Sequence, residues 1–239
     1  MKLLDISDVF DAIDWNPVTK EMAIHSGSSS AIYAASKKFA ELAVWEWAEA
    51  HPAVDVTTSK SIVFLVLHIW LTKIGTVLPP FLYGPLPPQH LPLPKPEFDT
   101  ISTNLVVYNL LFPNGVYMPA ARYVDFRDVA QAHIGALDSK PDKKDRKRII
   151  FVSPHGLTVK DVLDIIKKDH PDLERRFITS PVPQFPYDKV DVDFERIEEV
   201  TGMRKQDFRT LEQVSFLWLF PSCETLTRFA SSDDLRHCK

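Results

Sequence analysis

The feature that most constrains the fold is a long helical segment, which we expect to run from Ile32 to Ala50. Serines at 28–30 can start this helix, and Pro52 ends it, because proline cannot continue a helix. Four apolar residues recur within the segment at helical spacing and predict a buried stripe: Phe39, Leu42, Ala43 and Trp47. With a length of 239 residues, the chain fits one large α/β domain, or a main domain with a smaller lobe.

Shorter elements follow this helix along the chain. Further helices are expected at 100–112, 127–137 and 158–168. Strands are expected at 54–58, 148–152 and, briefly, 123–125. The apolar run 62–71 is too short to span a membrane, and a proline-rich loop opens at Pro79 and reaches Pro96.

Composition excludes several classes of function. Hydrophobic residues make up 45% of the chain, which is ordinary for a globular protein, and a net charge of -4 gives no reason to expect a nucleic acid partner. The basic run 143–148 is typical of a solvated turn before a strand. Cys223 and Cys238 form neither a metal-ligand spacing nor a disulfide framework, and residues 1–14 resemble no signal peptide. We therefore expect a cytoplasmic protein with no metal site and no membrane contact.

The chemistry begins with Tyr33 and Lys37, which stand four residues apart and therefore share one face of the helix. A free tyrosine has a pKa of about 10 and donates its proton poorly at neutral pH. A neighbouring ammonium favours the phenolate and lowers that pKa. The pair therefore suits a general acid that protonates a carbonyl oxygen while a hydride reaches the carbon. A surface pair on a helix is the alternative that the spacing alone leaves open.

Four segments, in order, carry a resemblance to a known family: Tyr33–Glu41 after the turn Asp14–Pro17, then Pro79–Pro85, Tyr123–His133 and Ile149–Ile166. Together they resemble the extended short-chain dehydrogenases/reductases of the NAD-dependent epimerase/dehydratase superfamily. Within that family, the chain is most similar to the branch of the dihydroflavonol, cinnamoyl-CoA and methylglyoxal reductases. The resemblance implies an α/β fold: an incomplete Rossmann-type parallel sheet with a small C-terminal substrate lobe. It also implies NADP(H) as cofactor, with NAD(H) possible.

By position, the resemblance assigns roles to individual residues. Five of them would bind the cofactor: Tyr33, Lys37, Pro79, Pro80 and Asn104. Of these, Tyr33 would donate the proton, while Lys37 would lower the pKa of the tyrosine and hold the nicotinamide ribose. Pro79 and Pro80 would pack beside the nicotinamide. Asn104 and its two neighbours would line the cleft for cofactor and substrate: Ser102 and Thr103. A further set would be structural and tie the substrate lobe to the core: Asp125, Arg127 and Asp128.

The chain departs from the family pattern at several places. No two of its 7 glycines lie within six residues of each other, so the Gly-rich turn that binds a pyrophosphate is missing. The family's catalytic serine lies upstream of the Trp-Asn-Pro turn, and we expect the chain to begin too late to contain it. Residues 59–76 interrupt what would be one strand and are expected to be an insert. We expect 1–213 to form a partial NAD(P)-binding domain with its substrate lobe, and 214–239 to be a divergent tail.

These features favour an NAD(P)H-dependent oxidoreductase that reduces a ketone or aldehyde to an alcohol, with a small carbonyl compound as substrate. Because the Gly-rich turn and the serine are missing, we expect impaired activity and poor NADPH binding in this chain. Two alternatives stay open: a sugar-nucleotide epimerase or dehydratase of the same superfamily, and a non-enzymatic remnant. The Trp-Asn-Pro turn argues against the first. The sequence determines neither the substrate nor the oligomeric state.

Overall fold

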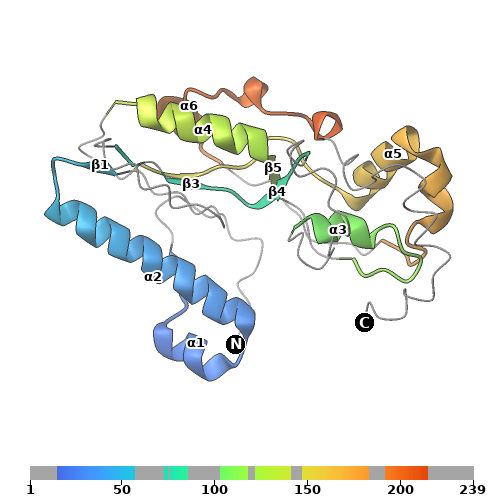
Figure 1. Ribbon diagram of the computed structural model, residues 1–239, viewed down its shortest axis with the longest axis horizontal. Helices are drawn as coiled ribbons and strands as arrows, with labels where there is room; N and C mark the ends of the chain where they lie inside the picture. The colour runs from blue at the N-terminus through green and yellow to red at the C-terminus, as the bar shows by residue number, and fades with distance from the viewer. Residues whose placement is uncertain are drawn as a thin grey trace, which may run out of the picture. The chain divides into compact units, whose positions relative to one another are not determined.

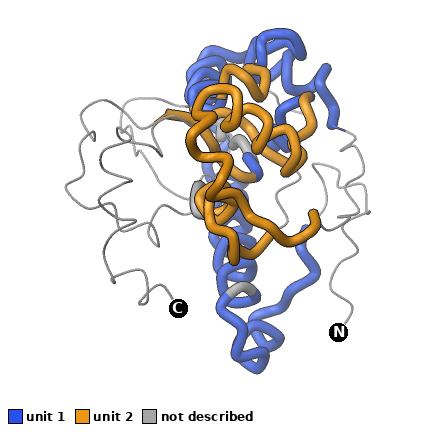
Figure 2. The backbone as a smooth tube through the Cα atoms, turned by 90° about the vertical axis from the view of Figure 1, so that its right-hand side faces the viewer, with its two compact units in different colours: residues 1–80, 127–154, 186–208 blue, residues 81–126, 155–185, 209–239 orange. Residues whose placement is uncertain are grey.

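The computed structural model describes residues 15–56, 73–74, 76–85, 103–117, 122–140, 147–182 and 192–214. They divide between two compact units (Figure 2). Unit 1 comprises residues 1–80, 127–154 and 186–208, and unit 2 comprises residues 81–126, 155–185 and 209–239. Each unit is therefore assembled from segments that lie far apart in the sequence.

Unit 1 contains two pairs of parallel strands. β1 (Asp55–Val56) pairs with β2 (Lys73–Ile74), and β3 (Thr76–Leu78) pairs with β6 (Arg148–Ile150). Parallel neighbours cannot be joined by a tight turn, because the chain must return to the same end of the sheet. Helix α4 (Phe126–Asp138) lies in the segment that makes this return between β3 and β6. The parallel pairing of strands between helices confirms the predicted α/β class.

Helices lie on both sides of these strands. α2 (Ser29–Ala50) and α4 lie on opposite sides of β3 (Figure 1). The shorter helical elements of the unit are α1 (Lys20–Ser26), α6 (Phe194–Thr201) and the 3₁₀ turn η4 (Lys205–Asp207). None of the helices in the described part of the chain is long and apolar enough to cross a membrane.

The longest helix, α2, begins and ends close to the predicted positions. The side chain of Ser28 accepts a hydrogen bond from the backbone N–H of Ala31, which caps the first turn. The helix ends at Ala50, and the backbone N–H of His51 closes its last turn on the carbonyl oxygen of Ala48. The serines and the following proline are therefore sufficient to locate this helix from the sequence.

The buried face of α2 differs from the predicted stripe. Ala35, Glu41 and Trp45 are buried. Of the four predicted residues, Phe39 and Leu42 are half-buried, whereas Ala43 and Trp47 are exposed. The prediction is therefore wrong for Ala43 and Trp47. The predicted stripe contains apolar residues alone and therefore omits Glu41. This residue is buried because Arg148 of β6 supplies its counter-charge.

Unit 2 is built around a third pair of parallel strands, β4 (Phe81–Tyr83) and β5 (Tyr123–Asp125). Its helical elements are α3 (Asn104–Asn109), α5 (Val159–Asp169), η3 (Pro171–Arg176) and η5 (Leu211–Gln213). The core of the unit draws buried side chains from each of these elements, including Tyr83, Val107, Tyr123, Val162, Ile166, Leu173 and Leu211. Unit 2 therefore has a hydrophobic core of its own.

The remaining predicted elements are confirmed within a few residues. Helices α4 and α5 lie within one residue of the expected bounds, and β5 coincides with the expected strand. Strand β6 ends two residues earlier than expected, and α3 is shorter than the predicted helix at 100–112. Strong periodicity therefore locates an element better than it locates its ends.

Close packing requires glycine at Gly135 and Gly84, among the described residues. A Cβ atom at Gly135 of α4 would overlap the carbonyl oxygen of Thr201, at the end of α6. In unit 2, Gly84 has a φ of 139°, and a Cβ atom there would lie 2.5 Å from the ring of Phe126. Any larger residue would force these contacts apart.

The predicted insert, 59–76, lies mostly outside the described residues. Its last residues are described, since Lys73–Ile74 form β2 and Thr76 opens β3. The two segments that would join into one strand therefore have different neighbours: β1 pairs with β2, and β3 pairs with β6. That 59–76 is an insert stays a prediction. The predicted tail also lies outside the described residues, except for Val214, which is buried in the core of unit 2.

Candidate active site

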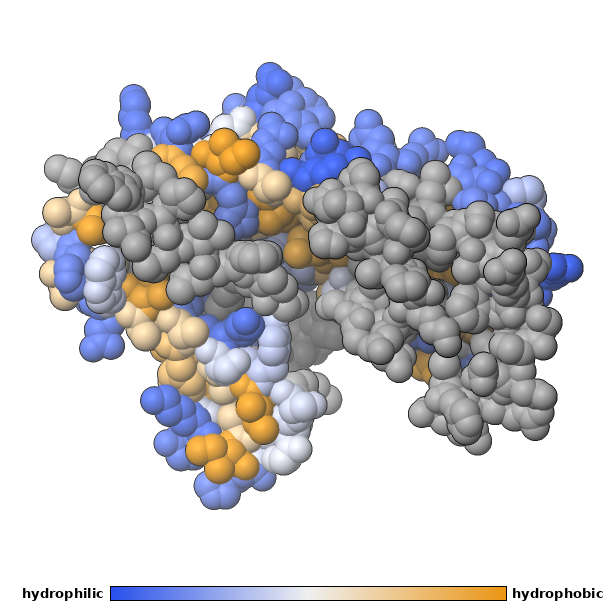
Figure 3. All heavy atoms as spheres, in the orientation of Figure 1, coloured by the Kyte–Doolittle hydropathy of each residue, from blue (hydrophilic) through white to orange (hydrophobic). Residues whose placement is uncertain are grey.

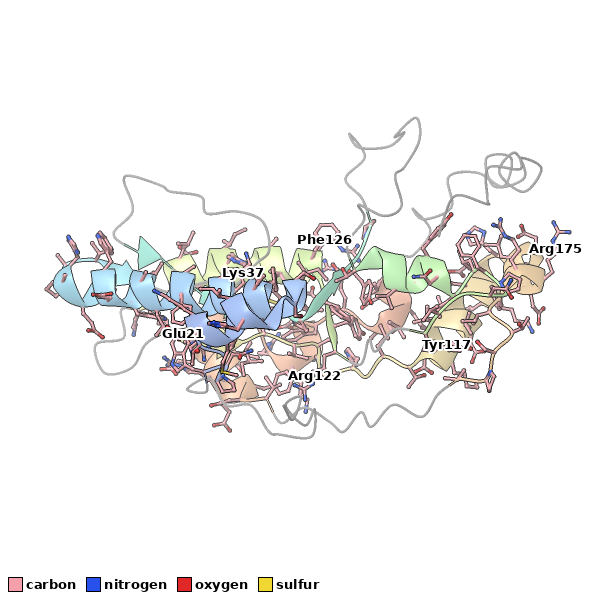
Figure 4. All side chains as sticks on the ribbon, turned by 90° about the horizontal axis from the view of Figure 1, so that it is seen from below. Glu21, Lys37, Tyr117, Arg122, Phe126 and Arg175 are labelled. Atoms are coloured by element: carbon pink, nitrogen blue, oxygen red, sulfur yellow. The ribbon has the colours of Figure 1, made fainter. Side chains whose placement is uncertain are left out.

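Tyr33 and Lys37 lie one turn apart on the same face of α2, as predicted. The ammonium of Lys37 lies over the ring of Tyr33, 5.4 Å from its centroid, which is within the range of a cation–π contact. Tyr33 is 47% exposed, and Lys37 is half-buried on α2 (Figure 4). The phenol is therefore accessible, while its cation is held against the helix.

Partial burial raises the pKa of Tyr33 above its ordinary value. The lowering of the pKa that the sequence led us to expect from Lys37 is not seen, because burial disfavours the charged phenolate. The hydroxyl therefore holds its proton at neutral pH, which is the state that a proton donor needs. In the described part of the chain, this hydroxyl makes no hydrogen bond.

Exposed apolar side chains gather over α1 and the first turns of α2 (Figure 3). Ile24 is 75% exposed, Ile32 is 51% exposed and Met22 is 41% exposed. Tyr33 directly follows Ile32 at this end of α2. Exposed apolar patches of this kind commonly mark ligand-binding or interaction surfaces.

A buried ion pair holds α2 against β6. Nε of Arg148 donates a hydrogen bond to Oε1 of Glu41 at 2.8 Å, and the two side chains are only 8% and 2% exposed. Nε1 of Trp45, one turn further along α2, donates to the same oxygen at 3.4 Å. The guanidinium of Arg148 also lies 4.5 Å from the ring centroid of Trp15. These contacts fix α2 one turn beyond Lys37.

The Trp-Asn-Pro turn is tied to the same helix. The backbone N–H of Val18 donates to Oδ1 of Asn16 at 2.9 Å, which closes the turn. Nζ of Lys38 donates to the carbonyl oxygen of Val18 at 2.9 Å. Two neighbouring lysines of α2 therefore have different partners: Lys38 bonds to the turn, whereas Lys37 contacts Tyr33.

Pro79 and Pro80 follow β3 directly and are half-buried. They lie at the carboxyl end of β3, which is the edge at which parallel α/β sheets bind their ligands. The chain leaves the neighbouring strand β6 at the same edge through Phe151 and Ser153, which are both buried. The two prolines thus occupy the strand end that the sequence predicts.

Asn104 belongs to unit 2, where it is the first residue of α3. Oγ1 of Thr103 donates a hydrogen bond to the carbonyl oxygen of Leu82 in β4 at 2.7 Å, which fixes the start of this helix. Ser102 lies outside the described residues. Asp125, at the end of β5, and Asp128, in the first turn of α4, are both fully buried, and the structural role expected for them stays a prediction.

The Glu41–Arg148 pair is the feature of this site that the sequence did not predict. The prediction of a solvated turn at 143–148 is wrong for its last two residues, since Lys147 and Arg148 are both buried. Glu41 and its partner are 107 residues apart in the chain. A glutamate beside the apolar residues of α2 was the one local signal that could have indicated a buried counter-charge. The described residues hold no group of three His, Cys, Asp or Glu side chains that could bind a metal ion.

Comparison with known proteins shows that this chain is similar to reductases. No family model matches the chain. An uncharacterised oxidoreductase of Schizosaccharomyces pombe is 31% identical over 167 residues, which cover 69% of this chain and 42% of the relative. The NADPH-dependent methylglyoxal reductase of Saccharomyces cerevisiae is 31% identical over 172 residues, which cover 71% of this chain and 44% of the relative.

The fold is similar to that of a solved reductase. The crystal structure of yeast methylglyoxal/isovaleraldehyde reductase, complexed with NADPH, aligns with a TM-score of 0.55 at 23% identity. This alignment covers 84% of the present chain and 52% of the other. The chain is therefore similar to NADPH-dependent methylglyoxal reductases, as the resemblance to the extended short-chain dehydrogenases/reductases implies, and it has a Rossmann-type fold. It spans about half the length of the curated relatives that it matches.

Proposed function

We propose that this chain carries the proton-donating part of an NADPH-dependent reductase, which converts a ketone or aldehyde to an alcohol. The observation that carries the proposal is the contact between Lys37 and the accessible Tyr33 on one face of α2. It is supported by the similarity to an enzyme named as an NADPH-dependent methylglyoxal reductase. The proposed substrates are small carbonyl compounds, and NAD(H) is the alternative cofactor.

In the proposed reaction, the hydroxyl of Tyr33 donates its proton to the carbonyl oxygen of the substrate as a hydride arrives at the carbonyl carbon. The carbonyl is thereby reduced to an alcohol, and the phenolate left on Tyr33 is stabilised by the nearby ammonium of Lys37. When bound, the nicotinamide supplies this hydride from its C4 position. The raised pKa of Tyr33 keeps the hydroxyl protonated before the reaction.

The residues present fit the nicotinamide end of such a cofactor. In the described part of the chain, the ammonium of Lys37 makes no hydrogen bond, so its donors are available to ribose hydroxyls. Pro79 and Pro80, at the carboxyl end of β3, would pack against the nicotinamide ring. Asn104, the first residue of α3 in unit 2, is proposed as a further cofactor-binding residue from its position in the sequence alone.

The pyrophosphate end of the cofactor has no counterpart in this sequence. Its 7 glycines are too far apart to form a Gly-rich turn. We therefore expect NADPH to bind weakly to this chain, through its nicotinamide end. Residues 1–213 would be a partial NAD(P)-binding domain with 59–76 as an insert, and 214–239 would be a divergent tail. From the two cysteines we place the protein in the cytoplasm.

The test uses a fusion in which this chain, from Trp15 onward, follows the matching amino-terminal part of the Saccharomyces cerevisiae methylglyoxal reductase. The fusion should oxidise NADPH in the presence of methylglyoxal, as measured by the loss of nicotinamide absorbance. Its Tyr33→Phe variant should not. Tyr117→Phe is the matched control, because it also removes one phenol hydroxyl, but in unit 2.

A fusion that binds NADPH but keeps its turnover with Tyr33→Phe would refute the assignment. Binding of a nucleotide sugar, without reduction of any small carbonyl compound, would favour the epimerase or dehydratase alternative. If the fusion folds but binds neither ligand, the non-enzymatic alternative is favoured instead.

A further inference from the structure

We infer that Arg148 is a positioning residue of the proposed active site: by holding the carboxylate of Glu41, it keeps the ammonium of Lys37 free to act beside Tyr33. The inference rests on the proposed roles of Tyr33 and Lys37. It explains why a buried arginine on β6 is paired with the acidic residue one turn beyond the reacting lysine.

Glu41 is well placed to neutralise Lys37. The two residues stand four apart on α2, which brings their Cβ atoms within about 5–6 Å of each other. A lysine and a glutamate at this spacing ordinarily interact on a helix surface. In this structure the carboxylate of Glu41 is instead bonded to Arg148 at 2.8 Å and to Nε1 of Trp45 at 3.4 Å.

Lys37 is left with unused hydrogen-bond donors as a result. In the described residues, its ammonium makes no hydrogen bond and no ion pair, and its one recorded contact is with the ring of Tyr33. The adjacent Lys38 is different, because it donates to the carbonyl oxygen of Val18. An ammonium paired with a carboxylate would have fewer donors for a ribose and less charge to stabilise a phenolate.

Arg148 can outcompete Lys37 for Glu41 for two physical reasons. Its guanidinium is only 8% exposed, so its attraction to the buried carboxylate is weakly screened by water. It also lies against the ring of Trp15, which holds it in place. Without the guanidinium, Glu41 would lose this ion pair, and Lys37 and Lys38 are the lysines within one turn of it on α2.

The test measures how fast trace acetic anhydride acetylates each lysine of the full chain, resolved by mass spectrometry. Arg148→Met should slow the acetylation of Lys37 by about twofold, as expected from one new ion pair at this spacing. Adding Glu41→Gln to Arg148→Met should restore the rate, because no carboxylate is then left to pair. Arg148→Lys should also leave the rate of Lys37 unchanged, since it keeps a cation against Glu41.

A purely structural role for Arg148 predicts a change of opposite sign. A loosened α2 would expose its lysines, so that Lys37 and Lys38 would both be acetylated faster in Arg148→Met. That result would overturn the inference. Slower acetylation of Lys38 alone would also overturn the inference, since Glu41 would then pair with Lys38 and not with Lys37.

A second variant keeps the inference testable if Arg148→Met fails to fold. In Glu41→Gln alone, the acetylation rate of Lys37 should equal that of the wild type, because Glu41 is not its partner. Faster acetylation of Lys37 in this variant would show that the two are already paired, and would overturn the inference. Acetylation requires neither NADPH nor turnover, so failure of the proposed reductase activity would be seen separately.

Discussion

Two places on α2 have opposite surroundings. In the first half of the helix, Tyr33 is 47% exposed and Lys37 contacts its ring, whereas in the second half Glu41 and Trp45 are each 4% exposed. The second half is bonded to β6 through Arg148. The difference shows how one helix can satisfy two requirements: the proposed proton donor Tyr33 stays accessible, while burial two or three turns away fixes the backbone that carries it.

The two tryptophans of this helix show the same division over a distance of two residues. Trp45 is 4% exposed and donates to Glu41, whereas Trp47 is 45% exposed and stacks on His51 with 4.1 Å between ring centroids. Residue type therefore does not predict which side of α2 is buried. The direction of the side chain relative to the strands decides it.

The largest effect is expected in the accessible half, on the rate of reaction. In the fusion described above, Tyr33→Phe should lower the turnover of carbonyl reduction by about 10²–10⁴-fold, because only the proton donor is lost. The affinity for NADPH, measured by calorimetry, and the melting temperature should stay close to those of the parent. Lys37→Met should weaken both turnover and NADPH binding. A lower melting temperature in Tyr33→Phe would contradict this comparison, because it would show that Tyr33 also stabilises the fold.

In the anchored half, loss of one member of the ion pair should affect stability. Arg148→Met should lower the free energy of unfolding by about 3–5 kcal/mol, because it removes the guanidinium that pairs with the buried carboxylate of Glu41. Urea denaturation measures this change. The double variant Glu41→Gln with Arg148→Met should recover much of the loss. If Arg148→Met cost less than about 1 kcal/mol, the pair would behave as a solvent-screened surface pair and would not anchor α2.

The tryptophans offer a matched comparison within the helix. Trp45→Ala should lower the free energy of unfolding by about 3 kcal/mol or more, because it removes a buried ring and leaves a cavity. Trp47→Ala should change it by about 0.5 kcal/mol, as is typical of surface substitutions. Both values come from the same denaturation experiment. Equal losses for the two variants would contradict the assignment of buried and exposed faces.

A small effect, similar to that of Trp47→Ala, is expected at the first turn of α2. Ser28→Ala should lower the free energy of unfolding by about 0.5 kcal/mol, the low end for an N-cap, because its hydrogen bond to Ala31 is long at 3.4 Å. Ser29→Ala, at the next position, should have a smaller effect and serves as the control. A loss as large as that for Trp45→Ala would mean that the first half is also anchored.

Much of the fold could be predicted because its signals are local. The bounds of α2, α4 and α5 follow from caps, prolines and apolar periodicity that act within a few residues. The shared face of Tyr33 and Lys37 follows from helical geometry alone, and the contact between them confirms it. The order of the resembling segments was sufficient to predict the family and the α/β class.

The sequence by itself therefore determined the helices, the shared face of Tyr33 and Lys37, and the resemblance to a family of reductases. Only the tertiary structure decided that Glu41 is buried against Arg148, that Trp47 faces solvent, and that the pKa of Tyr33 is raised rather than lowered. The physical reason is that helix geometry is fixed over a single turn of neighbouring residues. Burial, which sets both the strength of a charge pair and the pKa of a phenol, depends on segments that the fold brings from more than a hundred residues away.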